Sequence, residues 1–173
     1  MTIQICPGVI MSELTIKNEF MGTRGKHQAM RGDEIIASLT GSTASTSFRL
    51  AKRLYTVTFD TGQVIEFRQL GGFTIDHVLY EMYLDNEYLG RVKRRSVKVV
   101  YEIDMVGGKL FSIEQGWLAR GAIKYTNLAG DEITIETGRT GILNWEVSSE
   151  NELPSLDIAL ILFVRVMSEL MIQ

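Results

Sequence analysis

The apolar run at residues 158–164 is the feature that most limits how this chain can fold. Ser155 can cap the first backbone amides of a helix, and Asp157 suits the positive end of the helix dipole, so we expect a helix to begin there. Seven consecutive apolar residues span about two helical turns and therefore cover every face of that helix. A helix that is apolar on every face must be buried on all sides.

Such a helix can be buried in a lipid bilayer or in a protein interior. A membrane span needs about 20 apolar residues with few charges, but this segment carries Asp157, Arg165 and Glu169. Arg165 near the middle of a bilayer would cost about 2.5–3.5 kcal/mol. Arg165 and Glu169 also stand four residues apart, so they can form an ion pair along the helix. We therefore expect the helix to lie inside the protein, and we expect no transmembrane segment.

The rest of the chain reads as short runs in which apolar and polar residues alternate, separated by turn residues. The clearest hairpins are 55–68, around Asp60-Thr61-Gly62, and 78–92, around Asp85-Asn86-Glu87. Further alternating runs lie at 97–103, 110–114, 122–126, 133–136 and 142–147. A period of two gives each run one apolar face and one wetter face, as in strands that cover a core.

Two segments near the middle of the first half read differently. Residues 41–47 are small and polar, and we expect them to form a mobile loop rather than a strand interior. Residues 48–54 fit either a strand or a short helical turn, and periodicity does not decide between them.

These patterns predict one mainly β domain that spans residues 1–173. No Pro/Ser-rich linker, low-complexity tract or shift in composition divides the chain. An eight-stranded barrel has room only for side chains, whereas about eleven or twelve strands can enclose a helix. The runs amount to roughly ten to twelve strands, so we expect a closed antiparallel barrel of about twelve strands around a central hydrophobic C-terminal helix.

Charge and cysteine content bound the partners and the compartment. The formal net charge of −3 gives no overall attraction to nucleic acid or to anionic lipid, so either would need a local basic patch. Nucleic acid is therefore not an expected partner. Cys6 is the single cysteine, which fits a reducing compartment, and residues 1–11 lack the basic and long apolar regions of a signal peptide. We expect a cytoplasmic protein, peripheral at the membrane if it binds lipid.

The densest group of positive charge is the basic run Arg91, Lys93, Arg94, Arg95 and Lys98. In a strand, Arg91, Lys93 and Arg95 share one face, which can engage the phosphates of lipid headgroups. The alternative is a solvated outer face of a barrel hairpin, as charged runs usually are. Lys52 and Arg53 form a smaller basic group that could lie nearby.

No pattern of catalytic or metal-binding residues stands out. Asp60-Thr61-Gly62 matches the tripeptide of aspartic proteases but also makes an ordinary hairpin turn, which we favour. His27 is expected to be a solvated loop residue and His77 to begin a strand, and neither has a nearby metal ligand. Glu102 and Asp104 share a strand face, and we interpret them as solvated. Trp117 and Trp145 are expected to pack in the core or at a barrel end. Because none of these residues forms a catalytic or metal-binding pattern, we predict no enzyme, no metal and no cofactor.

The order of elements resembles the tubby C-terminal-like superfamily, which includes tubby-like proteins, phospholipid scramblases and LURP-one-related proteins. The similarity is clearest in Leu89-Gly90-Arg91-Val92-Lys93-Arg94, Val100-Tyr101-Glu102-Ile103-Asp104, Trp145-Glu146-Val147 and residues 156–162. The resemblance implies a twelve-stranded antiparallel barrel around a central hydrophobic helix. The cysteine-rich and calcium-binding segments of scramblases are absent, as is the closing signature of the tubby family. The chain is most similar to small bacterial members, for which the resemblance supplies no biochemical role.

Two functional hypotheses remain open on the sequence. The first is a non-enzymatic interaction module that contacts anionic phospholipid headgroups through the basic run. The alternative is a cytosolic structural or protein-partner domain with no small ligand. A barrel that holds a small apolar ligand is a third, against which the central helix argues because it fills the lumen.

Overall fold

The computed structural model describes residues 12–19, 26–44, 52–71, 77–95, 99–115, 122–137 and 144–170. These ranges form twelve strands and one helix. The elements are β1 (Ser12–Glu19), β2 (Lys26–Arg31), β3 (Glu34–Ala44), β4 (Lys52–Phe59), β5 (Val64–Gly71), β6 (His77–Leu84), β7 (Glu87–Arg95), β8 (Val99–Met105), β9 (Lys109–Gln115), β10 (Ala122–Thr126), β11 (Glu132–Glu136), β12 (Trp145–Ser149) and α1 (Ser155–Leu170).

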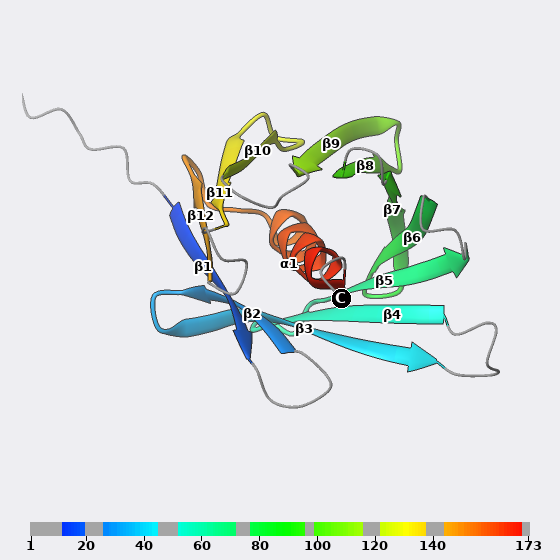
Figure 1. Ribbon diagram of the computed structural model, residues 1–173, viewed down its shortest axis with the longest axis horizontal. Coiled ribbons are helices and arrows are strands. Elements are labelled where there is room, and N and C mark those ends of the chain that lie inside the picture. The colour runs from blue at the N-terminus through cyan, green and yellow to red at the C-terminus, as the bar shows by residue number, and fades with distance from the viewer. Residues whose placement is uncertain are drawn as a thin grey trace, which may run out of the picture.

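All twelve strands belong to one antiparallel sheet, which wraps around α1 (Figure 1). Successive strands pair with each other along the chain except β9 and β10, and β1 also pairs with β12. No hydrogen-bonded ladder joins β9 to β10 in the described ranges, but the ring of Phe111 on β9 stacks on that of Tyr125 on β10, with centroids 6.2 Å apart. The barrel is therefore nearly closed, and its one seam is held by side chains.

The predicted hairpins are confirmed. β4 and β5 are joined at Asp60-Thr61-Gly62, where the Gly62 amide donates to the Phe59 carbonyl at 3.0 Å. β6 and β7 are joined by Asp85 and Asn86, which have φ angles of 47° and 70°. Positive φ at both central residues matches the right-handed twist of paired strands, and Asp and Asn tolerate it better than most residues.

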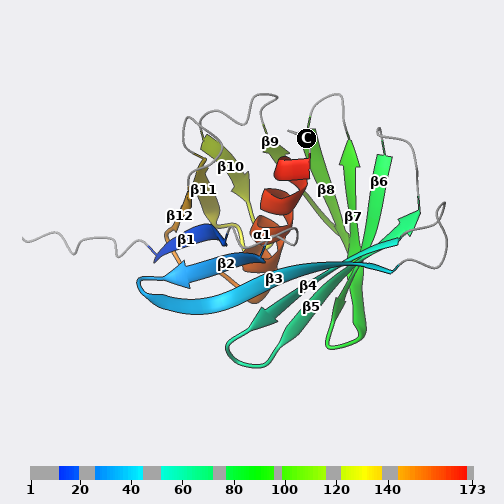
Figure 2. The same ribbon diagram turned by 60° about the horizontal axis from the view of Figure 1, so that its bottom comes forward.

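Alternation along the strands directs one row of side chains onto α1. Residues 157–168 of α1 are all buried, as expected for a helix that is apolar on every face. Phe163 lies at the centre: its ring stacks on Phe67 at 4.4 Å and meets Tyr80 and Tyr55 edge-on at 4.9 and 5.9 Å. The predicted fold, a mainly β barrel of about twelve strands with a central C-terminal helix, is confirmed (Figure 2).

The prediction of a loop from residue 41 is wrong for residues 41–44, which belong to β3 and pair with β4. Gly41 lies opposite Tyr55, and a Cβ at Gly41 would come within 3.0 Å of the Tyr55 ring. The glycine that suggested a loop therefore makes room for an inward aromatic side chain. Residues 45–51 lie outside the described ranges, and β4 begins at Lys52.

Gly90 on β7 is required by close backbone packing. Its φ is 153°, and a Cβ there would lie 2.2 Å from the Asp104 carbonyl oxygen of β8. No other residue type fits at that separation without moving β7 from β8.

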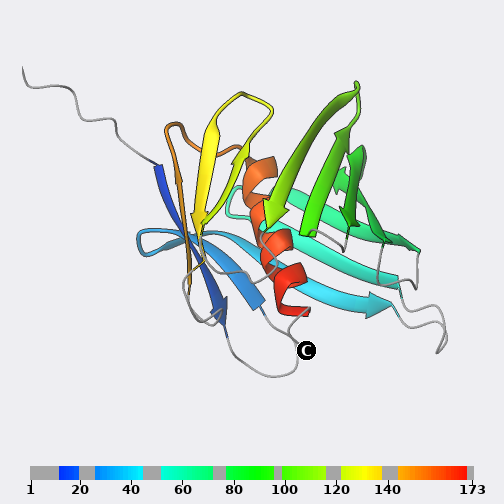
Figure 3. The same ribbon diagram turned by 45° about the horizontal axis from the view of Figure 1, so that its top comes forward.

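The barrel has two chemically different ends. The turn end carries the tight turns at 32–33, 60–63, 85–86, 106–108 and 127–131, together with the start of α1. The exit end carries the C-terminal turns of α1 and the opposite strand ends, such as the start of β4 and the end of β7 (Figure 3). In the described ranges, no helix is both long enough and apolar enough to cross a lipid bilayer.

The Phe163 side chain provides a test of the central helix. Phe163→Ala should lower the free energy of unfolding by about 3–5 kcal/mol, because the fully buried ring leaves a cavity that the barrel cannot close. Chemical denaturation measures this loss. Leu110→Ala, at a side chain that is 70% exposed, is the matched control and should change stability by less than about 0.5 kcal/mol. Equal, small losses for both variants would show that α1 does not form the core.

Candidate functional site

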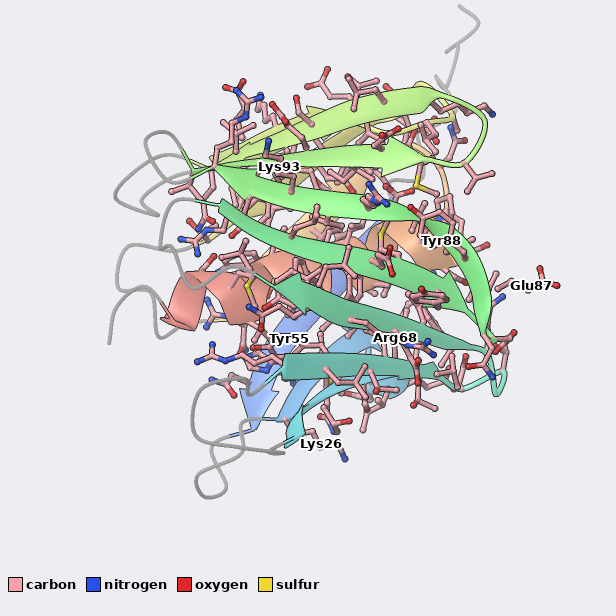
Figure 4. The ribbon with its side chains drawn as sticks, turned by 90° about the vertical axis from the view of Figure 1, so that its right-hand side faces the viewer. Lys26, Tyr55, Arg68, Glu87, Tyr88 and Lys93 are labelled. Carbon is pink, nitrogen blue, oxygen red and sulfur yellow. The ribbon has the colours of Figure 1, made fainter. Side chains whose placement is uncertain are left out.

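The predicted basic run divides between the two faces of β7. Arg91 and Arg95 are exposed and Lys93 is partly exposed on the outer face, as expected, while Val92 between them is buried against the core. Figure 4 looks onto this outer face, with Lys93 toward the exit end and Glu87 at the turn end. Lys98 lies outside the described ranges.

The outer basic residues are matched by carboxylates of the flanking strands. Arg91 forms an ion pair with Glu81 of β6 at 3.8 Å, and Arg95 forms one with Glu102 of β8 at 2.9 Å. Lys93 also lies opposite Glu102 in the ladder between β7 and β8, and Arg91 lies opposite Asp104. Exposed ion pairs add little stability, but these carboxylates cancel much of the local positive charge. The outer face of β7 therefore resembles a solvated hairpin face, which was the alternative to a phosphate-binding face.

The same face continues onto β5 and β6 as a network of charged and aromatic side chains. Arg68 forms an ion pair with Glu66, and its guanidinium lies 4.0 Å above the ring of Tyr83. The Tyr83 hydroxyl donates to Glu81 at 2.8 Å, and this hydrogen bond is the main reason that the pKa of Tyr83 is raised. Figure 4 shows Arg68 and Tyr88 on this side of the barrel.

Arg94 does not belong with the other basic residues, because alternation turns it into the barrel. Its ladder neighbours are Val78 on β6 and the fully buried Tyr101 on β8. The Nε atom of Arg94 is buried and has no hydrogen-bond partner among the described residues. The sequence grouped Arg94 with Arg91, Lys93 and Arg95 by proximity in the chain, but strand geometry separates them.

Arg94 belongs instead to an inner group at the exit end, here called the Arg–Tyr cluster: Arg53, Tyr55, Tyr80, Arg94 and Tyr101. Burial raises the pKa of Tyr80, and the positive charges of Arg53 and Arg94 lower it in part. Burial raises the pKa of Tyr101 to about 12, again partly offset by Arg94. Arg53, from the smaller basic group, and Arg94 both act on Tyr80, so each lies on the Tyr80 side of the barrel wall. The Lys52 side chain lies outside the described set.

Helix α1 adds a hydroxyl to the same region. Ser168 Oγ lies next to the Tyr101 phenol and can donate to Gln115 Oε1 at 2.9 Å or to the Val164 carbonyl at 2.7 Å. The Tyr101 oxygen is buried and has no hydrogen-bond partner at normal distance among the described residues. Within the cluster, Tyr55 is hydrogen-bonded to Arg53 and to Tyr80, whereas Arg94 Nε and the Tyr101 hydroxyl are buried without a partner among the described residues.

Two polar residues lie deeper inside than the sequence suggested. His27 was expected to be a solvated loop residue, but it is buried on β2. Its neighbour Lys26 is exposed, and strand alternation turns His27 inward. Arg165 of α1 is also buried, with its guanidinium 5.0 Å from the ring of Trp145. The expected ion pair of Arg165 with Glu169 stays a prediction, because the Glu169 side chain is not among those that the structure describes.

The remaining sequence candidates fall into structural positions. Trp145 is buried in the core as predicted, and Trp117 lies outside the described ranges. Glu102 and Asp104 point outward from β8, and His77 begins β6 as expected. Among the residues that the structure describes, no group of three His, Cys, Asp or Glu residues could hold a metal ion.

A second buried polar network lies at the turn end, where α1 begins. The Asp157 carboxylate accepts hydrogen bonds from the Tyr125 hydroxyl at 2.8 Å and from Asn127 Nδ2 at 3.3 Å. Asn127 Oδ1 in turn accepts from the backbone amides of Ala129 and Asp131. Burial raises the pKa of Asp157, although the two hydrogen bonds lower it in part. The network fixes the start of α1 to the turn between β10 and β11.

The sequence did not single out the tyrosines of the Arg–Tyr cluster. Tyr55, Tyr80 and Tyr101 were interpreted only as strand residues. Strand alternation was the available signal. Arg53 stands two residues before the inward-facing Tyr55, and Arg94 stands two residues after the inward-facing Val92, so both arginines occupy inward-facing positions. Two arginines at inward-facing positions of their strands are unusual, because such positions are mostly apolar.

Comparison of the chain with models of known protein families, with curated proteins and with solved structures finds no match.

The raised pKa of Asp157 predicts how stability depends on pH. As the pH rises above 3.8, the unfolded chain ionises this carboxyl before the folded protein does, so the folded state loses stability until its own raised pKa is passed. In Asp157→Asn this loss should disappear, and the stability of the variant relative to wild type should rise over that pH window. Urea unfolding at a series of pH values measures it.

Asp60→Asn, which removes an exposed carboxylate from the β4–β5 turn, controls for the change in net charge. A pH profile of Asp157→Asn that runs parallel to wild type would rule out Asp157 as the responsible group.

Proposed function

We propose that this protein is a non-enzymatic interaction module that binds anionic phospholipid headgroups with the exit end of its barrel, as a cytoplasmic protein peripheral at the membrane. The observation that carries the proposal is a group of exposed basic side chains on one side of the exit end. Exposed basic side chains stand at the exit end of three strands: Lys26 on β2, Arg53 on β4 and Arg95 on β7. A surface of this kind can approach an anionic membrane although the whole chain is acidic.

The turn end has the opposite charge. Exposed carboxylates occupy or adjoin its turns: Asp33, Glu34, Asp60, Asp85, Glu87, Glu132, Glu150 and Glu152. Arg31 at that end forms an ion pair with Glu152 at 2.9 Å. An anionic surface would repel this end and so favour approach by the other.

The positive charge at the exit end is itself confined to one side. Glu114, Glu136 and Glu146 are exposed at that end on β9, β11 and β12. The membrane contact would therefore be made by the side of the exit end formed by β2 to β7.

The packing of the interior supports a surface contact rather than an enclosed apolar ligand. The Phe163 ring packs against Phe67, Tyr55 and Tyr80, so α1 occupies the space in which an eleven- or twelve-stranded barrel would otherwise hold a ligand. Twelve strands around a C-terminal helix also suit the architecture implied by the tubby-like resemblance, which gives further support to lipid binding.

A second candidate function is binding of a protein partner at the turn end. Val106 and Leu110, at the turn between β8 and β9, are 63% and 70% exposed, which is unusual for large apolar side chains. This observation favours a small apolar contact but does not indicate the partner.

Liposome co-sedimentation tests the lipid proposal. The protein should sediment with vesicles that contain an anionic lipid, and not with neutral vesicles, and binding should fall as salt screens the charges. The double variant Lys26→Glu/Arg95→Glu should lose most of this binding, because each lysine or arginine near an anionic surface contributes about 1 kcal/mol.

The matched control is Lys109→Glu/Lys124→Glu, which makes the same change in net charge at exposed sites on β9 and β10. Equal binding by the two double variants would reject the exit end as the membrane contact. If the wild-type protein does not sediment with anionic vesicles, lipid binding is rejected and the protein-partner function remains.

A further inference from the structure

The guanidinium of Arg94 is a charged group on the inner face of an otherwise apolar barrel wall. Its neighbours across the ladders are Val78 and Tyr101, and its Nε atom is buried. Removing a cation from water is costly unless an anion or several hydrogen-bond acceptors replace the lost hydration. The position of Arg94 therefore raises the question of which anion lies against it.

The described residues do not supply a carboxylate for Arg94. No described acidic side chain lies within ion-pair distance of its guanidinium. Asp157 is the one described carboxylate that is buried, and it lies at the turn end with Tyr125 and Asn127. Glu81 and Glu102 flank β7, but they point outward, toward Arg91 and Arg95.

The groups around Arg94 are hydrogen-bond donors. The Tyr101 hydroxyl is buried without a partner at normal distance among the described residues, and the Tyr80 phenol lies within the fields of both Arg53 and Arg94. Arg94 and Tyr101 lie opposite each other in the β7–β8 ladder, and a guanidinium and a phenol with unpaired buried donors suit an anion with several oxygens. A phosphate monoester fits this set, because planar guanidinium groups bind phosphate oxygens in pairs and phenols donate single hydrogen bonds.

The C-terminus of α1 is a competing negative charge. The last turn of α1 contains no described basic residue of its own, so Arg94 could instead complement the helix dipole there. A helix terminus carries only about half an elementary charge, however, and its effect falls off within a turn. It would offset part of the charge of Arg94 and would leave the Tyr101 hydroxyl unpaired.

We propose that the Arg–Tyr cluster is a binding site for the phosphoryl group of a phosphate monoester, with Arg94 as its central ligand and with Tyr101 and Arg53 as further donors. The site goes beyond the proposed membrane contact, because it selects one phosphate chemistry and can take it from a lipid headgroup or from a free phosphate. Arg94 faces the interior and contributes little to the exposed charge of the exit end, so the two proposals can fail separately.

Isothermal titration calorimetry on the full chain tests the site with two soluble probes, inorganic phosphate and glycerol 3-phosphate, at fixed ionic strength. A third arm uses vesicles that contain phosphatidic acid, a phosphate monoester, beside vesicles with an equal charge of phosphatidylglycerol, a diester. Binding of a soluble probe identifies a free phosphate as a sufficient ligand. Binding to phosphatidic acid vesicles alone, in preference to phosphatidylglycerol, identifies a lipid headgroup.

Arg94→Gln should weaken phosphate-monoester binding by about tenfold or more, because it removes a charged hydrogen bond to the ligand. Tyr101→Phe should weaken it less, since the ring is retained and only the hydroxyl is lost. Arg91→Gln, on the outer face of the same strand, is the matched control and should bind like wild type.

Thermal unfolding separates this role from a purely structural one. Without phosphate, Arg94→Gln should unfold at the same temperature as wild type or higher, because it removes a partly buried cation whose buried Nε has no hydrogen-bond partner among the described residues. With phosphate, the melting temperature of wild type should rise relative to an equal ionic strength of chloride, and that of Arg94→Gln should not.

Three outcomes would overturn the site. The first is no binding of wild type to either soluble probe and no preference for phosphatidic acid vesicles. The second is an equal loss of binding in Arg91→Gln and Arg94→Gln. The third is an Arg94→Gln variant that melts well below wild type without phosphate and still binds the probes normally, which would assign Arg94 to the helix terminus.

Discussion

The burial of one helix that is apolar on every face determines the rest of this structure. No single sheet face could cover such a helix, so the sheet must pass all the way around it. Twelve short antiparallel strands do so, and their inner side chains converge on Phe163 and its neighbours. The aromatic contacts of Phe163 with Tyr55, Phe67 and Tyr80 come from the three adjacent strands β4, β5 and β6, so one helical residue packs against a continuous part of the barrel wall.

Much of this fold could be predicted because its strongest signals are local. The run at 158–164 and the hairpin turns at 60–62 and 85–86 each follow from a few adjacent residues. The errors arose where a side chain is defined by its partner across the sheet. Gly41 looked like a loop residue because the ring of Tyr55, which occupies its empty side, is fourteen positions away in the chain. His27 looked solvated because the neighbouring Lys26 is.

The candidate site shows the same limit more sharply. Five basic residues within eight positions formed an obvious group in the sequence. In the barrel, Arg91 and Arg95 meet carboxylates of the adjacent strands, while Arg94 points to the other side of the wall. Of its companions there, Tyr80 comes from the other strand of the same hairpin and Arg53 from the preceding hairpin, so the group is apparent only once the inward-facing positions of β4, β6 and β7 are set side by side. The net charge was equally uninformative, because it sums the carboxylates of the turn end with basic and acidic side chains that occupy different sides of the exit end.

The place of α1 in the chain has a consequence for how the protein is made. A ribosome releases the chain from its N-terminus, so all twelve strands emerge before the helix that fills them. Until α1 has been synthesised, the inward-facing Ile, Val and aromatic side chains have no helix to pack against. β1 also cannot pair with β12 until β12 has been synthesised, more than a hundred residues later. Contacts of such long range make folding slow and leave strand edges open to other chains. Completion of this barrel is thus a late event of synthesis, and a growing chain that meets chaperones before then is protected at its most vulnerable stage.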